Sequence, residues 1–213
     1  PIPTLHAGAK IALASDFLLT VSWDAKTEQS VFQVIRFETG EVMRAWNSPF
    51  RISACEVSPS ADLVVCGGAI EGQRKALFAM DFLTGKQVWL TEYAEREFHG
   101  VRDIAFSPDG KSLVACNWNS AILIRDTATG DIIQHLNLSN HTATAAAFSP
   151  DGTLLVTTGS NVSPAVVWDL KTGQRIAALI GHRFGRIYRT RFLSNARLVT
   201  VGGETEGEVC VWD

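Results

Sequence analysis

Apolar segments rich in β-branched residues alternate along this chain with short polar turns, and one kind of turn recurs at a regular interval. Each of these turns contains a Thr-Gly pair that stands between two apolar segments. The pairs are Thr39-Gly40, Thr84-Gly85, Thr129-Gly130 and Thr172-Gly173, spaced about 45 residues apart. Because glycine tolerates the positive φ of tight hairpin turns, the pattern predicts a repeated unit of strand, turn and strand.

Two further markers run in phase with the Thr-Gly pairs. Ser107-Pro108-Asp109-Gly110 and Ser149-Pro150-Asp151-Gly152 combine a proline that presets φ, an aspartate that can bond its own backbone and a glycine for the left-handed position. Ser58-Pro59-Ser60-Ala61 is a degenerate copy. A strand led by leucine recurs in the same register, beginning at Leu18, Leu63, Leu113, Leu155 and Leu198. We therefore expect about five copies of one β-unit.

Together these markers resemble the WD repeat. Trp168-Asp169 and Trp212-Asp213 stand in the positions that give the family its name, and Gly181-His182 resembles its Gly-His element. The resemblance implies an all-β fold, a β-propeller of four-stranded antiparallel blades around a central channel. With about five blade units, the chain is expected to form a partial propeller.

The Thr-Gly register excludes one further Trp-Asp dipeptide from the naming position. Trp23-Asp24 has the right letters, but Thr39-Gly40 places the naming position of that repeat at Ile35-Arg36. Trp23-Asp24 is therefore predicted at the end of the second strand or in the loop after it. The same register puts Met80-Asp81 and Arg125-Asp126 in the naming positions of the next two repeats.

Residues 1–213 are expected to form a single WD-repeat propeller region. Its repeats cover roughly residues 6–50, 51–98, 99–140, 141–181 and 182–213. Residues 1–5 fit two interpretations: they complete the last blade and close a ring, or the chain is a stretch of a longer propeller. We favour the second interpretation, because seven blades are common in this family and five-bladed rings are unusual.

Composition and charge narrow the class of partner. No run approaches the roughly 20 apolar residues of a membrane span, so we expect no membrane partner. The net charge of −3 argues against nucleic acid as the main partner. The cysteines lie in predicted strands without metal-type Cys-x-x-Cys spacing, which favours buried thiols in a reducing, cytoplasmic compartment. They are Cys55, Cys66, Cys116 and Cys210.

The histidines near the repeat starts are His6, His99, His141 and His182. Because equivalent positions in different blades lie apart, we do not expect them to converge on one metal ion. In WD repeats such a histidine joins a hydrogen-bond chain with a hydroxyl of the second strand, an Asp of the next turn and the Trp. The resemblance implies Thr157 with Trp168 in one repeat. It implies Thr200 with Trp212 in the last repeat, where the Asp is missing and Glu206 is a candidate substitute.

Motifs for catalysis or nucleotide binding are missing from the sequence. No Gly-x-Ser-x-Gly occurs, and the Gly-Gly pairs lack the Lys-Ser/Thr or helix start of a phosphate loop. We therefore expect no catalytic residue, no metal site and no cofactor.

Positive charge gathers in one stretch, our first candidate for a partner-binding surface. Arg183, Arg186, Arg189 and Arg191 are interleaved there with Phe184 and Tyr188. Strand alternation places Arg189 and Arg191 on one face, with Tyr188, Thr190 and Phe192 on the other. This would be the innermost strand of the last blade, so the arginines are candidates for the channel or its rim, where arginine and aromatic residues favour binding. The alternative is that the arginines pair with neighbouring carboxylates.

A second candidate surface is the loop between the second and third strands, which varies from repeat to repeat. Loops of this kind carry specificity because they do not hold the core. Trp118 and Asn119 lie in one of them. Trp118 is a large aromatic residue in a polar turn, and packing on the adjacent blade is its alternative role.

The expected function is a non-catalytic scaffold that binds a protein or peptide through loops and channel rim, within a larger multidomain protein or complex. The alternative is an enzyme. Residues Ala79 to Trp89 resemble the tryptophan-docking motif of quinoprotein dehydrogenases, which implies that Trp89 locks neighbouring blades and that pyrroloquinoline quinone lies in the channel beside a metal. Trp46 stands six residues after Gly40 rather than four, so the motif matches in one repeat only.

Overall fold

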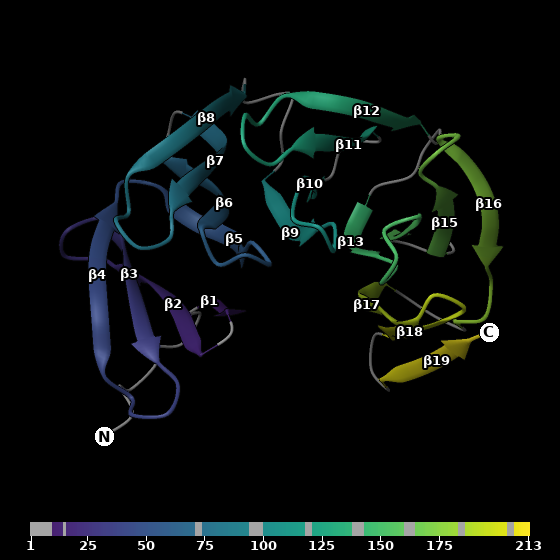
Figure 1. The fold of residues 1–213 in the computed structure, drawn as a ribbon, viewed down its shortest axis with the longest axis horizontal. Coiled ribbons are helices and arrows are strands. Elements are labelled where there is room, and N and C mark those ends of the chain that lie inside the picture. The colour runs from purple at the N-terminus through teal and green to yellow at the C-terminus, as the bar shows by residue number, and fades with distance from the viewer. Residues whose placement is uncertain are drawn as a thin grey trace. The chain divides into compact units, whose positions relative to one another are not determined.

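Every regular element that the structure describes is a β-strand, which confirms the all-β class (Figure 1). The computed structural model describes residues 10–14, 16–70, 74–93, 100–117, 121–137, 143–159, 165–182, 186–203 and 207–213. In this part of the chain the strands form five antiparallel sheets, and consecutive strands are neighbours in each sheet. Such a meander is the topology of a propeller blade.

The chain divides into two compact units. The first extends to Val101 and includes the turn Ala128–Gly130, and the second holds Arg102–Thr127 and Asp131–Asp213. The first unit contains two four-stranded sheets. One consists of β1 (Lys10–Ala14), β2 (Phe17–Asp24), β3 (Gln29–Arg36) and β4 (Val42–Ser48). The other consists of β5 (Arg51–Val57), β6 (Leu63–Ile70), β7 (Arg74–Asp81) and β8 (Gln87–Tyr93).

The second unit contributes three sheets. The first comprises β9 (Val101–Phe106), β10 (Ser112–Asn117), β11 (Ala121–Asp126) and β12 (Ile132–Asn137). The next comprises β13 (Ala143–Phe148), β14 (Leu154–Gly159), β15 (Ala165–Asp169) and β16 (Gln174–Leu179). The described strands of the last are β17 (Ile187–Ser194), β18 (Arg197–Gly202) and β19 (Glu208–Trp212). Residues 1–5, the candidate closing strand, lie outside the described residues.

The Thr-Gly turns form as the sequence predicts. Their glycines have φ between 68° and 78°, in the left-handed region that favours glycine. Where the naming dipeptide keeps its Asp, the carboxylate can hold the turn: Asp81 Oδ1 accepts the backbone N–H of Thr84 at 2.7 Å and its hydroxyl at 2.7 Å. Asp169 makes the same two bonds with Thr172. The Asp thus stabilises the turn that ends its own strand.

The predicted register of the naming positions is confirmed. Trp23-Asp24 ends β2, the second strand of its sheet, whereas Ile35-Arg36 ends β3. Pairing with the fourth strand shifts register directly before each naming residue in all four complete sheets. These residues are Ile35, Met80, Arg125 and Trp168. A bulge at this point increases the local twist of the outer strand pair.

The core follows the two-residue period of the strands. In β15, Val166 and Trp168 enter one apolar cluster of the second unit. Ala165 and Val167 point the other way and enter a second cluster with Phe192. Because both faces of β15 are covered, its sequence is apolar from Ala165 to Trp168. The first unit has a cluster of its own, built around Leu19, Phe32 and Phe78.

Two tryptophans of the first unit lie against glycines of later turns. A Cβ placed on Gly130 would stand 2.7 Å from the Trp89 ring, as the docking resemblance implies for that residue. A Cβ on Gly85 would likewise stand 2.6 Å from the ring of Trp46. The sequence motif matches in one repeat only, but a tryptophan packs against the glycine of the next Thr-Gly turn in two. Trp46 lies two residues further along its strand than the motif requires, and a two-residue offset keeps a side chain on the same face.

Candidate functional site

Two of the four arginines of the predicted surface, Arg189 and Arg191, lie on β17, an edge strand of its sheet that contacts β13 in the second unit. The Arg189 side chain is 70% exposed, and Arg191 is exposed as well. Tyr188 is 47% exposed on the same strand. We call Tyr188, Arg189 and Arg191 the β17 surface.

A bulge at the start of β17 makes the observed alternation of side chains differ from the predicted one. Arg189 and Arg191 are exposed and Phe192 is buried, as strand alternation predicts. Tyr188 departs from the prediction, because the pairing with β18 shifts register between Ile187 and Arg189. The shift leaves Tyr188 exposed while Ile187 is buried, with 2% of its surface accessible. The phenol ring therefore adds to the exposed surface beside the arginines instead of to the core.

Asp103 on β9 is the acidic group beside this surface. One carboxylate oxygen accepts the backbone N–H of Ala146 on β13 at 3.2 Å, and the other lies 3.6 Å from a guanidinium nitrogen of Arg189. Burial raises the pKa of the Asp103 carboxyl, and the Ala146 N–H and the Arg189 charge oppose that rise. Because the arginine end of this ion pair is exposed, the pair is weak and leaves the guanidinium accessible to another anion.

Arg191 makes no hydrogen bond or ion pair with its side chain to any residue in the described ranges. The expected alternative, pairing to neighbouring carboxylates, therefore applies to Arg189 and not to Arg191 within this part of the structure. An exposed guanidinium group presents several N–H donors in a planar fork that matches a carboxylate.

Hydrogen bonds beneath β17 fix its position. The Ile187 carbonyl oxygen accepts the Thr144 hydroxyl at 2.9 Å and the Thr158 hydroxyl at 3.3 Å. Thr144 and Thr158 belong to β13 and β14, so these bonds join two neighbouring sheets of the second unit. They hold the first residue of β17 immediately before Tyr188, and the exposed side chains are thus presented from a fixed backbone.

The predicted hydroxyl and tryptophan pairs are also confirmed. Trp168 Nε1 donates to Thr157 Oγ1, and Trp212 Nε1 donates to Thr200 Oγ1, each at 2.9 Å. His182 Nε2 lies 2.7 Å from the same Thr200 oxygen. A threonine hydroxyl that accepts the indole N–H still has a proton to donate, so it can donate to Nε2 and leave the proton of a neutral imidazole on Nδ1.

Glu208 stands beside the other nitrogen of this histidine. Its Oε2 lies 3.3 Å from His182 Nδ1, although the pair lacks hydrogen-bond geometry. The carboxylate thus occupies the place that the resemblance assigned to a turn Asp. Glu206, the expected substitute, lies outside the described residues. The histidine is tied to strands β18 and β19, which supports its predicted structural role.

The remaining predicted site residues are only partly described. Arg186 is half-buried, and its carbonyl oxygen accepts the Gly203 N–H at 3.2 Å. Arg183, Phe184, Trp118 and Asn119 lie outside the described residues. Sequence reasoning missed Asp103, because its partner on β13 lies 43 residues further along the chain and no local motif marks the pair.

Neither a cluster of metal-ligating side chains nor a helix suited to crossing a membrane is found in the described ranges. No three His, Cys, Asp or Glu side chains there lie close enough together to hold a metal ion. No helix in the same ranges is long and apolar enough to cross a bilayer.

Residues 56–151 match a family profile described as the anaphase-promoting complex subunit 4 WD40 domain. The chain is 26% identical over 161 residues to eukaryotic translation initiation factor 3 subunit I of Vanderwaltozyma polyspora, covering 68% of this chain and 44% of that protein. It is 30% identical over 115 residues to pre-mRNA-processing factor 19 homolog 2 of Arabidopsis thaliana, covering 53% of this chain and 21% of that protein. The matches therefore span less than half the length of either relative.

The fold has a counterpart among solved structures. Hydrazine synthase of Kuenenia stuttgartiensis matches with a TM-score of 0.75 and 15% sequence identity, over 94% of this chain and 61% of that chain. At this identity the likeness concerns the fold alone.

Proposed function

Because the chain belongs to the WD-repeat β-propellers, we propose that it is a non-catalytic scaffold that binds a protein or peptide partner. The observation that carries this proposal is the β17 surface, where two exposed arginines and a half-exposed tyrosine stand on a fixed strand. Arginine and tyrosine are enriched where protein partners bind most strongly. Two relatives bear the names of a complex subunit and a processing factor, which supports the same class of function.

We propose that residues outside the described ranges extend the binding surface. They are Arg183 and Phe184, which precede β17 in the sequence, and Trp118 and Asn119, which follow β10 in the sequence. The half-buried Arg186 belongs to the same stretch. On this proposal, residues 1–213 act as one WD-repeat region of a larger intracellular protein, in the cytoplasm and without nucleic acid or membrane as partner.

The test is charge reversal on the β17 surface. Arg189→Glu combined with Arg191→Glu is expected to lower partner capture by at least about tenfold, because the two substitutions reverse the charge presented to the partner. The melting temperature should fall by only a few degrees, because both side chains are exposed and the Arg189–Asp103 ion pair that is lost is weak. Capture is measured by quantitative mass spectrometry with the chain as bait.

Arg175→Glu is the matched control, because Arg175 is an exposed arginine on β16 of the same unit. It should leave capture unchanged. Capture that survives the double reversal, or that Arg175→Glu reduces equally, contradicts a specific β17 surface. A collapse of the melting temperature in the double variant would instead assign Arg189 and Arg191 to the fold.

The enzyme alternative rests on the docking of Trp89 over Gly130. This contact packs a strand against a turn, and it gives no evidence for a cofactor in the channel. Dye reduction by the protein after incubation with pyrroloquinoline quinone and calcium would favour this alternative over the scaffold.

A further inference from the structure

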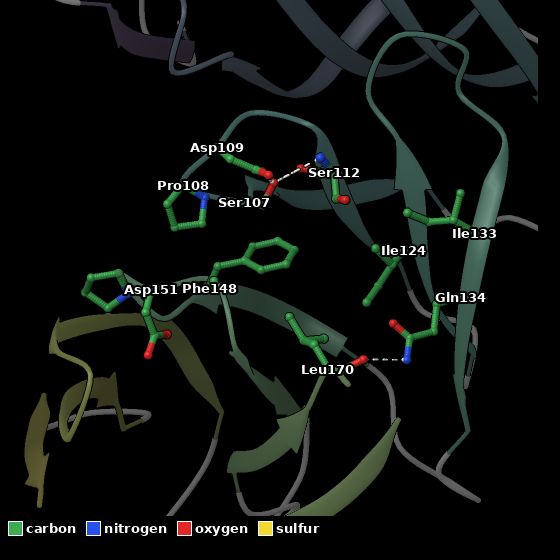
Figure 2. Close-up of a pocket in the computed structure, with 12 residues that line it drawn as sticks. Ser107, Pro108, Asp109, Ser112, Ile124, Ile133, Gln134, Phe148, Asp151 and Leu170 are labelled. Carbon is green, nitrogen blue, oxygen red and sulfur yellow. Dashed lines mark hydrogen bonds between the residues drawn. The ribbon is translucent and has the colours of Figure 1, made fainter. Parts of the chain in front are cut away.

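A cleft opens between two Ser-Pro-Asp-Gly turns of the second unit (Figure 2). One turn joins β9 to β10 and the other joins β13 to β14. The cleft has a volume of about 520 Å³, within the range of clefts that hold small ligands or side chains. It is separate from the β17 surface, since neither Tyr188, Arg189 nor Arg191 lines it.

The inner wall of the cleft is apolar. Figure 2 shows the Phe148 ring between the two turns, with Ile124 and Leu170 further in. Ile133 on β12 is 56% exposed and belongs to the same lining. This wall offers an aromatic face and aliphatic carbon on which the methylene stem of a long side chain can pack.

Both turns place an aspartate at the cleft. Asp109 Oδ1 accepts the Ser107 hydroxyl at 2.7 Å, and Asp151 Oδ1 accepts the Ser149 hydroxyl at 2.6 Å. These hydroxyls are the largest cause of the lowered pKa of each carboxyl, so both aspartates are ionised at neutral pH. The second oxygen, Oδ2, of each carboxylate makes no hydrogen bond or ion pair with a residue in the described ranges.

The cleft is held in shape from both ends. The Asp151 backbone N–H donates to Asn195 Oδ1 at 3.0 Å, which ties its turn to the segment between β17 and β18. Gln134 Nε2 donates to the Leu170 carbonyl oxygen at 3.0 Å across the far end. The apolar wall and the two free oxygens therefore stand in a fixed arrangement before any partner binds.

We propose that this cleft docks a cationic segment of a protein partner. The stem of an arginine or lysine side chain lies on Phe148, and the charged heads of the segment bind the carboxylates of Asp109 and Asp151. Three features favour a cation over other occupants. The apolar wall fits the stem, an aromatic ring attracts a cation placed over its face, and both charged groups of the lining are carboxylates. Lys111 follows Asp109 in sequence but does not line the cleft.

The probe is the peptide acetyl-(Arg)4-amide, titrated into the isotopically labelled chain and followed by NMR. Shifts are expected in residues 107–112 and 148–153, the two turns that bound the cleft. The double variant Asp109→Asn, Asp151→Asn should weaken binding at least about tenfold, because it removes both charges that a guanidinium would meet. The asparagine oxygens can still accept the serine hydroxyls, so the turns should persist.

Asp24→Asn combined with Asp81→Asn is the matched control, because both aspartates accept hydrogen bonds within turns of the first unit. It removes the same total charge from two turn aspartates outside the cleft, and it should leave the dissociation constant within about twofold. A second variant keeps the proposal testable if the double substitution disturbs the turns. Ile133→Ser shortens an exposed side chain of the lining, and it should weaken binding severalfold without changing the charge. Equal loss in the control, or full binding by both cleft variants, overturns the proposal.

Discussion

At the scale of single residues, the docked tryptophans show that this contact depends on which face of the strand carries the tryptophan. It does not depend on a fixed number of residues between the tryptophan and the preceding Thr-Gly turn. Trp46 and Trp89 stand at different distances from the preceding Thr-Gly turn, yet each lies against a glycine of the next one. A side chain at either glycine would collide with an indole ring. The glycine of a Thr-Gly pair therefore serves two purposes here, a left-handed backbone and room for the tryptophan.

Substitution of these glycines by alanine can separate the backbone role from the role of leaving room for the tryptophan. Gly85→Ala and Gly130→Ala are expected to destabilise the protein by about 1–3 kcal/mol more than Gly40→Ala, because only they overpack against a ring. The three glycines have φ of 68°, 78° and 69°, so the backbone strain is shared. Nothing lies within 4 Å of a Cβ at Gly40. Urea unfolding at neutral pH measures the differences, and three equal losses would contradict the clash.

At the scale of elements, aspartates at the strand ends hold the turns of the repeat. Asp62, Asp81 and Asp169 each accept bonds from a nearby Ser or Thr, and the pKa of each carboxyl is lowered by such bonds. A carboxyl whose pKa is lower in the folded state favours folding when it is ionised. That contribution is complete above the unfolded value, about 3.9, and is lost as the pH falls through the folded value.

The stability of the folded state should therefore fall in acid. Asp81→Asn with Asp169→Asn is expected to flatten this acid limb, because neither amide titrates. Asp103→Asn should act in the opposite direction. Burial raises the pKa of that carboxyl, so its ionisation above about pH 4 opposes folding, and its removal takes that cost away. Urea unfolding followed from pH 7 to pH 2.5 measures both effects. An unchanged acid limb in the turn variants would contradict the role of these carboxylates.

At the scale of the whole molecule, the chain has two compact units with separate apolar clusters. One buried cysteine in each unit can be used to follow the unfolding of that unit. Cys66 belongs to the cluster of the first unit and Cys116 to a cluster of the second. Burial raises the pKa of each thiol well above its ordinary value of 9.0. Since the thiolate is the reactive form, both are expected to be inert to alkylation in the folded protein.

As the urea concentration rises, the two units are expected to unfold one after the other, and alkylation of the buried cysteines detects each step. Cys66 and Cys116 are expected to react with different urea midpoints, because a chain of 213 residues with separate clusters need not unfold in one step. Iodoacetamide labelling, read site by site by mass spectrometry, gives both midpoints. Cys210 is only partly buried and should be labelled before either of them. Coincident midpoints for Cys66 and Cys116 would show one cooperative fold instead.

Much of the fold can be predicted from local patterns in the sequence. The Thr-Gly pairs predict where third strands end, and they remove Trp23-Asp24 from the naming position. Alternation within β17 predicts that Arg189 and Arg191 share a face. Tyr188 could not be placed in this way, because a bulge adds a residue to one strand and reverses the alternation beyond it. The pairing that creates the bulge involves β18 as well as β17.

The sequence by itself determined the strands, the turns and their register, because a turn depends on the φ of one glycine and the reach of one short side chain. Only the tertiary structure decided which residues of different repeats meet. Asp103 accepts the N–H of Ala146, Trp46 lies on Gly85, and Asp109 shares a cleft with Asp151. These contacts join residues about 40 positions apart, and they depend on how one sheet packs against the next. The repeat period predicts that packing only in outline, because each interface is filled by different side chains.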